Sequence, residues 1–233
     1  MTDTRKLRPA SGSLTAEAHA RIRAEILSCR LEPGQKLVIQ DICDAMGFSL
    51  GAVREALSRL TAEGLVEAEP RKGFRVAPVT ESELRDITMV RTKIEIACLE
   101  SAIRNGSLQW ESNIMALLFE LSKLPLADPG DPKRLSGTWA DTHKRFHLAL
   151  VAACDSPWLL RLRETLYLHS ERYRWMSLPR DRRQRNLHAE HEAIAAAAVA
   201  RDAGKACSLL VQHIAKTTQI LVEGRVPGSG VAR

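Results

Sequence analysis

The segment that decides the fold is residues 39–66, IQDICDAMGFSLGAVREALSRLTAEGLV. Its first apolar residues recur at helical spacing, and Gly47 is typical of a helix end because glycine adopts a left-handed backbone at little cost. Ser49 is a good N-cap for a second helix. The apolar stripe of that second helix consists of Val53, Ala56, Leu57 and Leu60. Two short helices joined by a tight glycine turn predict a helix-turn-helix.

The first turn of the second helix carries candidate DNA contacts. A recognition helix presents its N-terminal residues to base edges and the positive end of its dipole to phosphate. The residues at this position are Ser49, Leu50, Gly51 and Arg54. We expect Arg54 to contact a phosphate or a guanine.

A basic hairpin is expected directly after these helices. Two short runs with strand character, Leu65 to Ala68 and Phe74 to Ala77, flank the turn Arg71-Lys72-Gly73. A helix pair alone more often indicates ordinary helical packing, but a basic hairpin after it favours DNA binding. The hairpin is therefore interpreted as a wing, and its three turn residues as further DNA contacts.

Three stretches resemble the winged-helix domain of the GntR family of bacterial transcription regulators: LEPGQKL (31–37), VREALSRLTAEGLV (53–66) and PRKGFRV (70–76). The family pattern has Ser-Arg-Thr-Pro before the second stretch, where this chain has Ser49, Leu50, Gly51 and Ala52. The base-reading arginine of the family is absent at Leu50, so the operator sequence does not carry over. The SLGAVREALS variant is similar to the subgroup of the carbon-starvation-induced regulator.

Length and composition limit the class of protein. A chain of 233 residues is long enough for two modest domains, and its net charge of +6 fits a polyanionic partner without proving one. The five cysteines form no C-x-x-C pair, which indicates free thiols in a reducing compartment. The sequence shows neither a membrane-spanning run nor the apolar stretch of a signal peptide, so we expect a cytoplasmic protein without a membrane partner.

The expected organisation has four parts. They are a disordered arm (1–12), a winged helix-turn-helix (13–78), an all-helical effector- and metal-binding domain (79–223) and a flexible tail (224–233). Thr80 and Glu83 form a capping box that starts a long helix. Five further segments have a 3.6-residue apolar period: near 109–124, 138–154, 157–177, 181–201 and 203–223.

The predicted fold class is mainly α, with a small β wing in the N-terminal domain and a C-terminal all-α bundle. A loop is expected from Pro125 to Gly137, and no strand pattern competes with helix in this domain. Six helices after a GntR-type winged helix resemble the effector-binding (FCD) domain of the fatty-acid-responsive branch of that family.

Histidines lie on the inward faces of the expected helices. His143 and His147 are four residues apart on one helix, and His191 and His213 lie on the apolar stripes of the last two. One buried histidine is usually a core residue with a hydrogen-bond partner, but four converging imidazoles leave many nitrogens to satisfy. Because neutral imidazole is the commonest metal ligand, we expect a divalent metal, with zinc as first candidate and nickel or manganese as alternatives.

The family resemblance adds to the metal interpretation. Many members bind a metal through Asp-x-x-x-His on one helix and single histidines on the last two. His147, His191 and His213 match those histidine positions, whereas His143 replaces the aspartate. This replacement keeps a ligand and removes a negative charge, so it leaves the identity of the metal open.

The effector is expected to be a small organic acid. Arg91 lies in an otherwise apolar stripe, and Arg172 sits beside Tyr173 on a helix expected to face the same cavity. A buried guanidinium needs a carboxylate. Glu95 is an internal alternative for Arg91, and His169 is a candidate for the cavity wall. A carboxylate could bind the metal with one oxygen and an arginine with another.

The leading functional interpretation is a ligand-controlled transcription regulator rather than an enzyme. It would bind a pseudo-palindromic, double-stranded operator as a homodimer, and repression is the commoner mode in the family. A metal sensor is an alternative in which the metal itself is the signal. A metalloenzyme is the rival from another class, but the sequence has no acidic general base with its histidine pair as in H-E-x-x-H.

Overall fold

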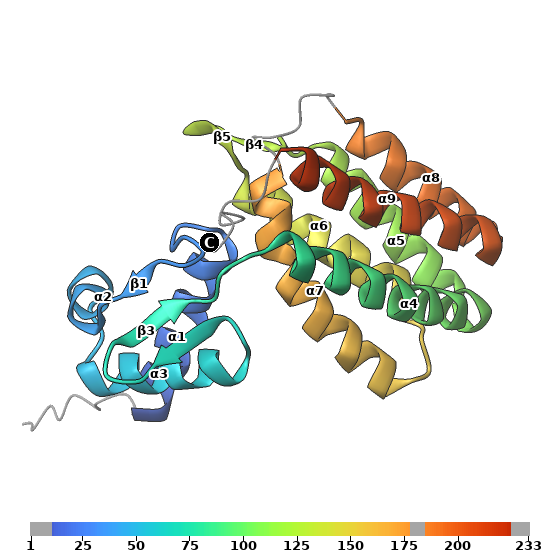
Figure 1. The fold of residues 1–233 in the computed structure, drawn as a ribbon. Helices are drawn as coiled ribbons and strands as arrows, with labels where there is room; N and C mark the ends of the chain where they lie inside the picture. The colour runs from blue at the N-terminus through green and yellow to red at the C-terminus, as the bar shows by residue number, and fades with distance from the viewer. Residues whose placement is uncertain (1–10, 178–184, 225–233) are drawn as a thin grey trace, which may run out of the picture. The chain divides into compact units, whose positions relative to one another are not determined.

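The computed structural model describes residues 11–177 and 185–224 (Figure 1). Contacts divide the chain into two compact units between Val79 and Thr80, called unit 1 and unit 2 below. Residues 1–10 of the expected arm and 225–233 of the expected tail lie outside the described residues. Ser11 and Gly12, which were assigned to the arm, already belong to the first helix.

Unit 1 combines helices with a small antiparallel sheet. The helices are α1 (Ser11–Leu27), α2 (Ile39–Met46) and α3 (Leu50–Ala62), and the strands are β1 (Lys36–Leu37), β2 (Val66–Glu69) and β3 (Gly73–Val76). Helix α1 packs against α3 through fully buried Ala18, Ile22 and Ile26. The sheet order is β1-β3-β2, and Val66 lies opposite Val76.

The helix-turn-helix has the local chemistry that the sequence predicts. Gly47 ends α2 with a φ of 74°, and its N–H donates to the carbonyl oxygen of Cys43 at 2.8 Å. The Ser49 hydroxyl accepts a hydrogen bond from the N–H of Ala52 at 3.3 Å and so caps α3. The stripe Val53, Ala56, Leu57 and Leu60 is fully buried.

The wing differs from the prediction in two details. Strand β2 begins one residue later than expected, at Val66, and β3 begins one residue earlier, at Gly73. Strand β1 is an addition, in which Lys36 pairs with Arg75. A strand of two residues is too short to show an alternating pattern, so periodicity does not predict it.

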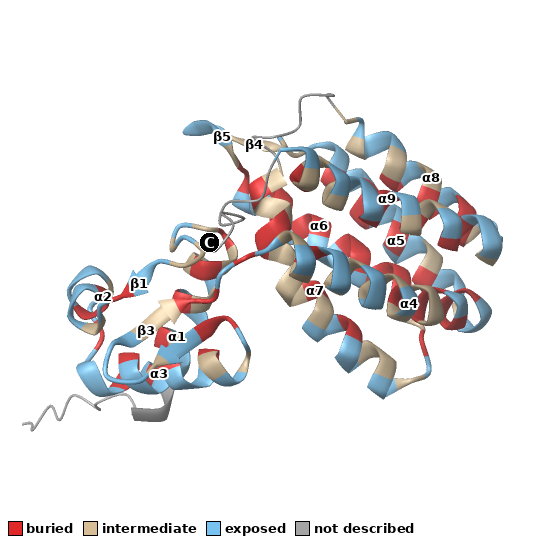
Figure 2. Ribbon diagram, viewed as in Figure 1, coloured by how far each residue is buried: buried red, intermediate tan, exposed pale blue. Residues whose placement is uncertain are grey.

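Unit 2 is a helical bundle (Figure 2). Its helices are α4 (Glu81–Asn105), α5 (Leu108–Ser122), α6 (Gly137–Val151), α7 (Pro157–Ser177), α8 (Leu187–Val199) and α9 (Ala203–Glu223). Thr80 caps α4 by accepting from the N–H of Glu83 at 3.1 Å. Among the described helices, none combines the length and apolarity needed to span a bilayer.

The mainly α fold is confirmed, with one addition in unit 2. A short hairpin of β4 (Ala127–Asp128) and β5 (Asp131–Leu135) occupies the segment expected as a loop. The Asp128 side chain accepts from the N–H of Gly130 at 2.8 Å and closes the turn. The strands are short and contain proline and charged residues, so they lack an apolar alternation that the sequence could reveal.

Candidate metal centre

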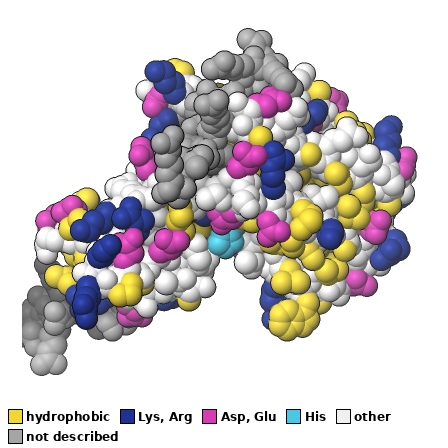
Figure 3. All heavy atoms as spheres, in the orientation of Figure 1, with side chains coloured by type: hydrophobic (Ala, Val, Ile, Leu, Met, Phe, Trp, Pro, Cys, Tyr) yellow, Lys and Arg dark blue, Asp and Glu magenta, His cyan; other side chains and the backbone are white. Residues whose placement is uncertain are grey.

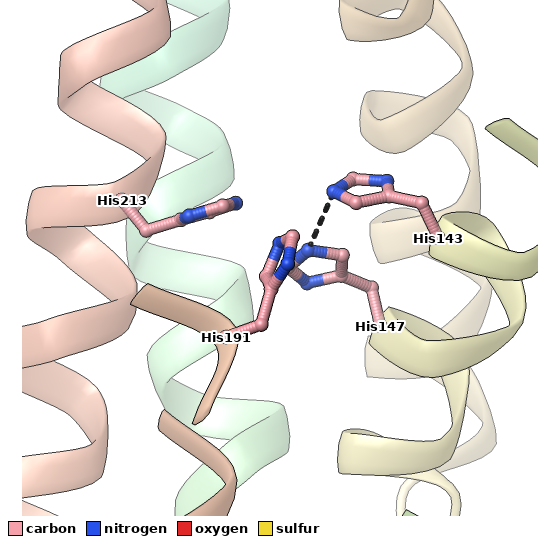
Figure 4. Close-up of side chains that lie close together, drawn as sticks. All are labelled: His143, His147, His191 and His213. Carbon is pink, nitrogen blue, oxygen red and sulfur yellow. Dashed lines mark hydrogen bonds between the residues drawn. The ribbon is translucent and has the colours of Figure 1, made fainter. Parts of the chain in front are cut away.

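Three helices bring four imidazoles together inside unit 2 (Figure 4). Helix α6 supplies His143 and His147 from successive turns, α8 supplies His191, and α9 supplies His213. Their exposed fractions are only 1–7%. The structure therefore brings together the four residues that the sequence predicts as metal ligands.

The spacing of the imidazole nitrogens suits a single ion. One ring nitrogen from each histidine lies within 4.8 Å of the other three, and Nε2 of His143 is 3.1 Å from Nε2 of His147. Two imidazole nitrogens on one tetrahedral zinc, at about 2.1 Å from it, are about 3.4 Å apart. Small side-chain movements would be enough to close this cluster around one ion.

One imidazole nitrogen of the four histidines has no hydrogen-bond partner among the described residues, and this is the strongest indication that the histidines suit a metal ion. Nε2 of His191 is buried and has no hydrogen-bond partner among the described residues. Leaving such a group unpaired costs about 1–3 kcal/mol, so buried polar atoms almost always find a partner. A metal–nitrogen bond would supply the missing interaction, and the donor set fits a divalent ion.

The protein environment keeps the imidazoles neutral, as metal binding requires. Burial lowers the pKa of His143, His147 and His191 well below the ordinary value, and neighbouring imidazoles lower it further. Burial also lowers the pKa of His213 to about 4, although its contact with Glu190 opposes the shift. The ring nitrogens are therefore unprotonated near neutral pH and available as ligands.

Glu190 orients one of the ligands. Its carboxylate accepts from Nδ1 of His213 at 2.9 Å, which leaves Nε2 of that ring as the free donor to a metal. Burial raises the pKa of Glu190, but hydrogen bonds from His213, Arg185 and Lys216 outweigh this effect and hold the pKa well below its usual range. The sequence prediction missed Glu190, because its partner His213 lies on another helix and their contact depends on how α8 packs against α9.

Trp139 and Arg163 support the two ligands on α6. The Trp139 ring stacks on His143 with 4.7 Å between ring centroids. The buried Arg163 donates to the backbone oxygen of His147 at 2.9 Å and to Glu95 at 2.8 Å. These contacts hold both imidazoles in place before any ligand arrives.

A cavity of about 40 Å³, called the polar cavity below, adjoins the histidines. Most of its walls are hydroxyl-bearing or ionisable side chains. They include Thr88, Arg91, Tyr167, Ser170, Glu171, Arg174 and Thr218, together with His143, His147 and His213. Arg91 donates to Glu95 at 3.2 Å and to the Ser170 hydroxyl at 2.7 Å, so the internal carboxylate proposed from the sequence is its partner here.

The other two expected effector residues lie elsewhere. Arg172 is fully buried and His169 is half-buried, and neither lines the polar cavity. The residues of α7 that line the cavity are Tyr167, Ser170, Glu171, Tyr173 and Arg174. Arg172 lies beside Tyr173 in the sequence, but it is buried in the bundle and is not part of the cavity wall.

Arg174 is the arginine that the sequence prediction missed. Its guanidinium pairs with Glu171, to which Nε donates at 3.0 Å. Its Nη1 is buried and has no hydrogen-bond partner among the described residues. The packing of α7 in the bundle, which sequence alone does not specify, decides that Arg174 rather than Arg172 lines the cavity.

The candidate DNA contacts are all exposed on unit 1. The first group lies at the start of α3, where Leu50 is 48% exposed. The second group is the turn between β2 and β3, where Arg71 and Gly73 have φ values of 65° and 92°. Lysine and arginine side chains gather on the face of unit 1 that Figure 3 shows. Both groups are therefore accessible to a polyanion.

Comparison with known proteins agrees with the fold. The model of the bacterial regulatory proteins of the gntR family matches residues 14–76, and that of the FCD domain matches residues 86–216. The chain is 36% identical over 209 residues to the uncharacterized HTH-type transcriptional regulator BphR of Paraburkholderia xenovorans (strain LB400), covering 90% of this chain and 85% of that protein.

Two further relatives come from Escherichia coli. The HTH-type transcriptional repressor GlaR of strain K12 is 34% identical over 197 residues, which cover 83% of this chain and 89% of GlaR. The solved structure of McbR/YncC superposes with a TM-score of 0.75 over 90% of this chain and 97% of that one, and its 22% identity supports the fold alone.

The family expected from the motifs is confirmed, and the relatives are transcription regulators rather than enzymes. The chain therefore belongs to the GntR family of bacterial regulatory proteins and is a DNA-binding transcription regulator with an FCD domain.

Proposed function

We propose that the protein is a repressor whose operator binding is controlled by a small organic acid bound beside a metal ion. Residues 13–78 bind double-stranded operator DNA, and residues 79–223 hold the metal and the acid. The observation that carries this proposal is the cluster of four buried imidazoles, in which Nε2 of His191 has no hydrogen-bond partner in the part of the chain that the structure describes. The name of the relative GlaR, a repressor, supports the mode of action.

The metal is held by His147, His191 and His213, with His143 as the fourth protein ligand. Imidazole suits zinc and nickel, whereas manganese prefers oxygen ligands, so the first two fit this set better. When bound, the ion supplies a positive, Lewis-acidic centre that attracts a carboxylate oxygen.

The acid is held in the polar cavity. Nη1 of Arg174 offers a buried, charged donor that has no hydrogen-bond partner within residues 11–177 and 185–224, and Arg91 lies in the same wall. Hydrogen bonds between a guanidinium and a carboxylate are among the strongest in proteins. A cavity of about 40 Å³ favours a small effector.

Operator recognition is assigned to the exposed residues of unit 1. Ser49, Leu50, Gly51 and Arg54 meet the major groove, and Arg71, Lys72 and Gly73 hold phosphate. Leu50 cannot donate to guanine, but it can contact the methyl group of thymine.

The proposed regulator is a homodimer, because a pseudo-palindromic operator has two related half-sites and each can take one copy of unit 1. Helices α4 and α7 pack against each other and expose apolar side chains that a second copy could cover. Met89 on α4 is 51% exposed, and Trp158 and Leu162 on α7 are 68% and 48% exposed. Exposed apolar groups of this kind are typical of association surfaces.

A metal sensor is the second candidate. Four histidines already complete the tetrahedral coordination of zinc, and a closed site of this kind needs no further ligand. In that case metal alone would change operator affinity. In the leading proposal the change requires the acid.

Elemental analysis of purified variants tests the metal centre. Protein prepared without chelator should contain about one divalent ion per chain, and His147→Ala, His191→Ala and His213→Ala should each lose it. His143→Asp, which restores the family ligand, should keep it, and His188→Ala is the matched control because His188 is exposed. A metal-free wild type that responds normally to its acid would leave the histidines as a hydrogen-bonded pocket only.

A further inference from the structure

A second cavity of about 40 Å³, called the apolar cavity below, adjoins the histidine cluster. It shares His143, Arg174, His213 and Thr217 with the polar cavity. The side chains that line only the apolar cavity include two polar ones, Ser177 and Arg185. The other five are Leu126, Leu135, Trp139, Leu187 and Ile220.

Both polar side chains have partners within the protein. The Ser177 hydroxyl donates to the backbone oxygen of Arg174 at 2.8 Å, and Arg185 donates to Glu190 and to the hydroxyl of Thr217. Neither calls for a polar ligand. The part of the apolar cavity that it does not share with the polar cavity therefore offers mainly hydrocarbon, and it suits an apolar substituent of a ligand.

Arg174 lies where the two cavities meet. It lines both, and its guanidinium carbon is 5.7 Å from the centroid of the Trp139 ring. Its Nη1 is buried without a hydrogen-bond partner among the described residues. An acid bound at this nitrogen can thus direct its polar end into one cavity and its substituent into the other.

We infer that the effector is an acid with a compact aliphatic substituent, whose carboxylate lies at Arg174 and whose substituent fills the apolar cavity. This inference rests on the proposed acid site and names the chemical class that the site accepts. A volume of about 40 Å³ suits a short branched chain better than a phenyl ring with its six carbons.

The hairpin of unit 2 gains a role from this inference. Leu126 precedes β4 and Leu135 ends β5, and the N–H of Ser136 donates to the oxygen of Leu126 at 2.9 Å. The hairpin thus returns the chain to the cavity, and α6 begins directly after it with Trp139 in its first turn. A plain loop of this length would not fix two leucines on one wall.

A series of matched acids tests the inference. Zinc-loaded, full-length protein is titrated calorimetrically with glycolate, lactate, 2-hydroxyisovalerate, 2-hydroxyisocaproate and mandelate, which differ only in the substituent. Affinity should rise about fourfold for each buried methyl or methylene group up to the isopropyl or isobutyl compound, and fall for the phenyl compound. Equal affinity across the series overturns the inference alone. Failure of every acid to bind, glycolate included, overturns the proposed acid site and the inference with it.

Two cavity-filling variants test whether the substituent of the acid binds in the apolar cavity. Leu187→Phe and Ile220→Phe change half-buried residues of α8 and α9 that line the apolar cavity. Each should keep its affinity for glycolate and lose the gain from the isopropyl group. Leu209→Phe is the matched control, because Leu209 is a half-buried leucine of α9 that lines neither cavity. If both variants fold, as thermal melting reports, and still prefer 2-hydroxyisovalerate, the substituent lies elsewhere and the inference is wrong.

Discussion

Two buried nitrogen atoms of unit 2, Nε2 of His191 and Nη1 of Arg174, have no hydrogen-bond partner among the described residues. Each is a donor or ligand of the kind that a bound species would satisfy: a cation for the imidazole and an anion for the guanidinium. Their neighbours are already engaged, since Glu171 pairs with Arg174 and Glu190 with His213. The unsatisfied atoms therefore point to two ligands of opposite charge.

Replacing Arg174 separates these ligands. Arg174→Gln removes the charged donor and leaves the four imidazoles untouched, so acid binding should weaken at least about tenfold while metal content stays the same. Calorimetric titration and elemental analysis on one preparation measure both. Arg161→Gln is the control, because Arg161 is an exposed arginine of the same helix that lines neither cavity. Joint loss of metal and acid in Arg174→Gln would contradict this separation.

Leu50 governs which bases the recognition helix prefers. An apolar side chain can meet a thymine methyl but cannot donate to guanine, so Leu50→Arg should change base preference more than overall affinity. Selection from a randomised operator library measures this change. Unaltered base preference in the variant would mean that Leu50 does not contact the bases of the operator.

Arg54 and Lys72 are expected to act differently from Leu50. Arg54→Ala should abolish operator binding, whereas Lys72→Ala should weaken binding to any sequence and reduce the slope of log affinity against log salt by about one. Gel-shift titrations at several salt concentrations measure both quantities. Normal binding by both variants would refute the DNA surface proposed for unit 1.

At the scale of elements, α4 and α7 are joined by a buried ionic cluster. Glu95 is 1% exposed and accepts from Arg91 on its own helix and from Arg163 on α7. Arg163 in turn donates to the backbone oxygen of His147. The same carboxylate thus stabilises the bundle and positions a proposed metal ligand.

Glu95→Gln should therefore destabilise the protein strongly. Removing one partner of a buried ion pair leaves uncompensated charge and costs about 3–5 kcal/mol of unfolding free energy. Glu81→Gln, which breaks the exposed pair between Glu81 and Arg85, should cost no more than about 1 kcal/mol. Urea denaturation of both variants gives the comparison. Equal costs would mean that the Glu95 cluster is not buried in solution.

The sequence predicts helices well where an apolar period extends over many residues. It predicts poorly the features that depend on contacts between distant parts of the chain. The apolar period and the caps at Ser49 and Thr80 give the helices, and the inward stripes give the four histidines. The hairpin before α6 was missed, because pairing across a short polar turn leaves no periodic pattern. Arg174 was missed because the orientation of α7 depends on packing that sequence alone does not specify.

For the whole molecule, the lowered histidine pKa values link stability to pH. In the metal-free protein the folded-state pKa of each of the four histidines lies below the ordinary value of 6.5, and that of His213 is about 4. Between these values the unfolded chain binds more protons than the folded one, so stability falls as pH falls. Each such histidine removes up to about 1.4 kcal/mol per pH unit.

Chelated protein should therefore lose unfolding free energy when pH is lowered from 7 to 5. Urea denaturation at each pH measures the loss. The lowered pKa of Glu190 contributes only below the ordinary glutamate value of 4.5, so it does not explain a loss above pH 5. Stability that stays constant from pH 7 to 5 would show that the imidazoles are not buried as described.

Operator affinity measured with and without metal tests the proposed control most directly. Fluorescence anisotropy of labelled operator is followed for zinc-loaded and chelated protein, each with and without the small carboxylate that most raises the thermal midpoint of the loaded form. The loaded protein should release operator when the acid is added, and neither zinc alone nor the acid with chelated protein should change the affinity. Release by zinc alone would make the protein a metal sensor, and an equal response of the chelated protein to the acid would contradict a metal centre that holds the effector.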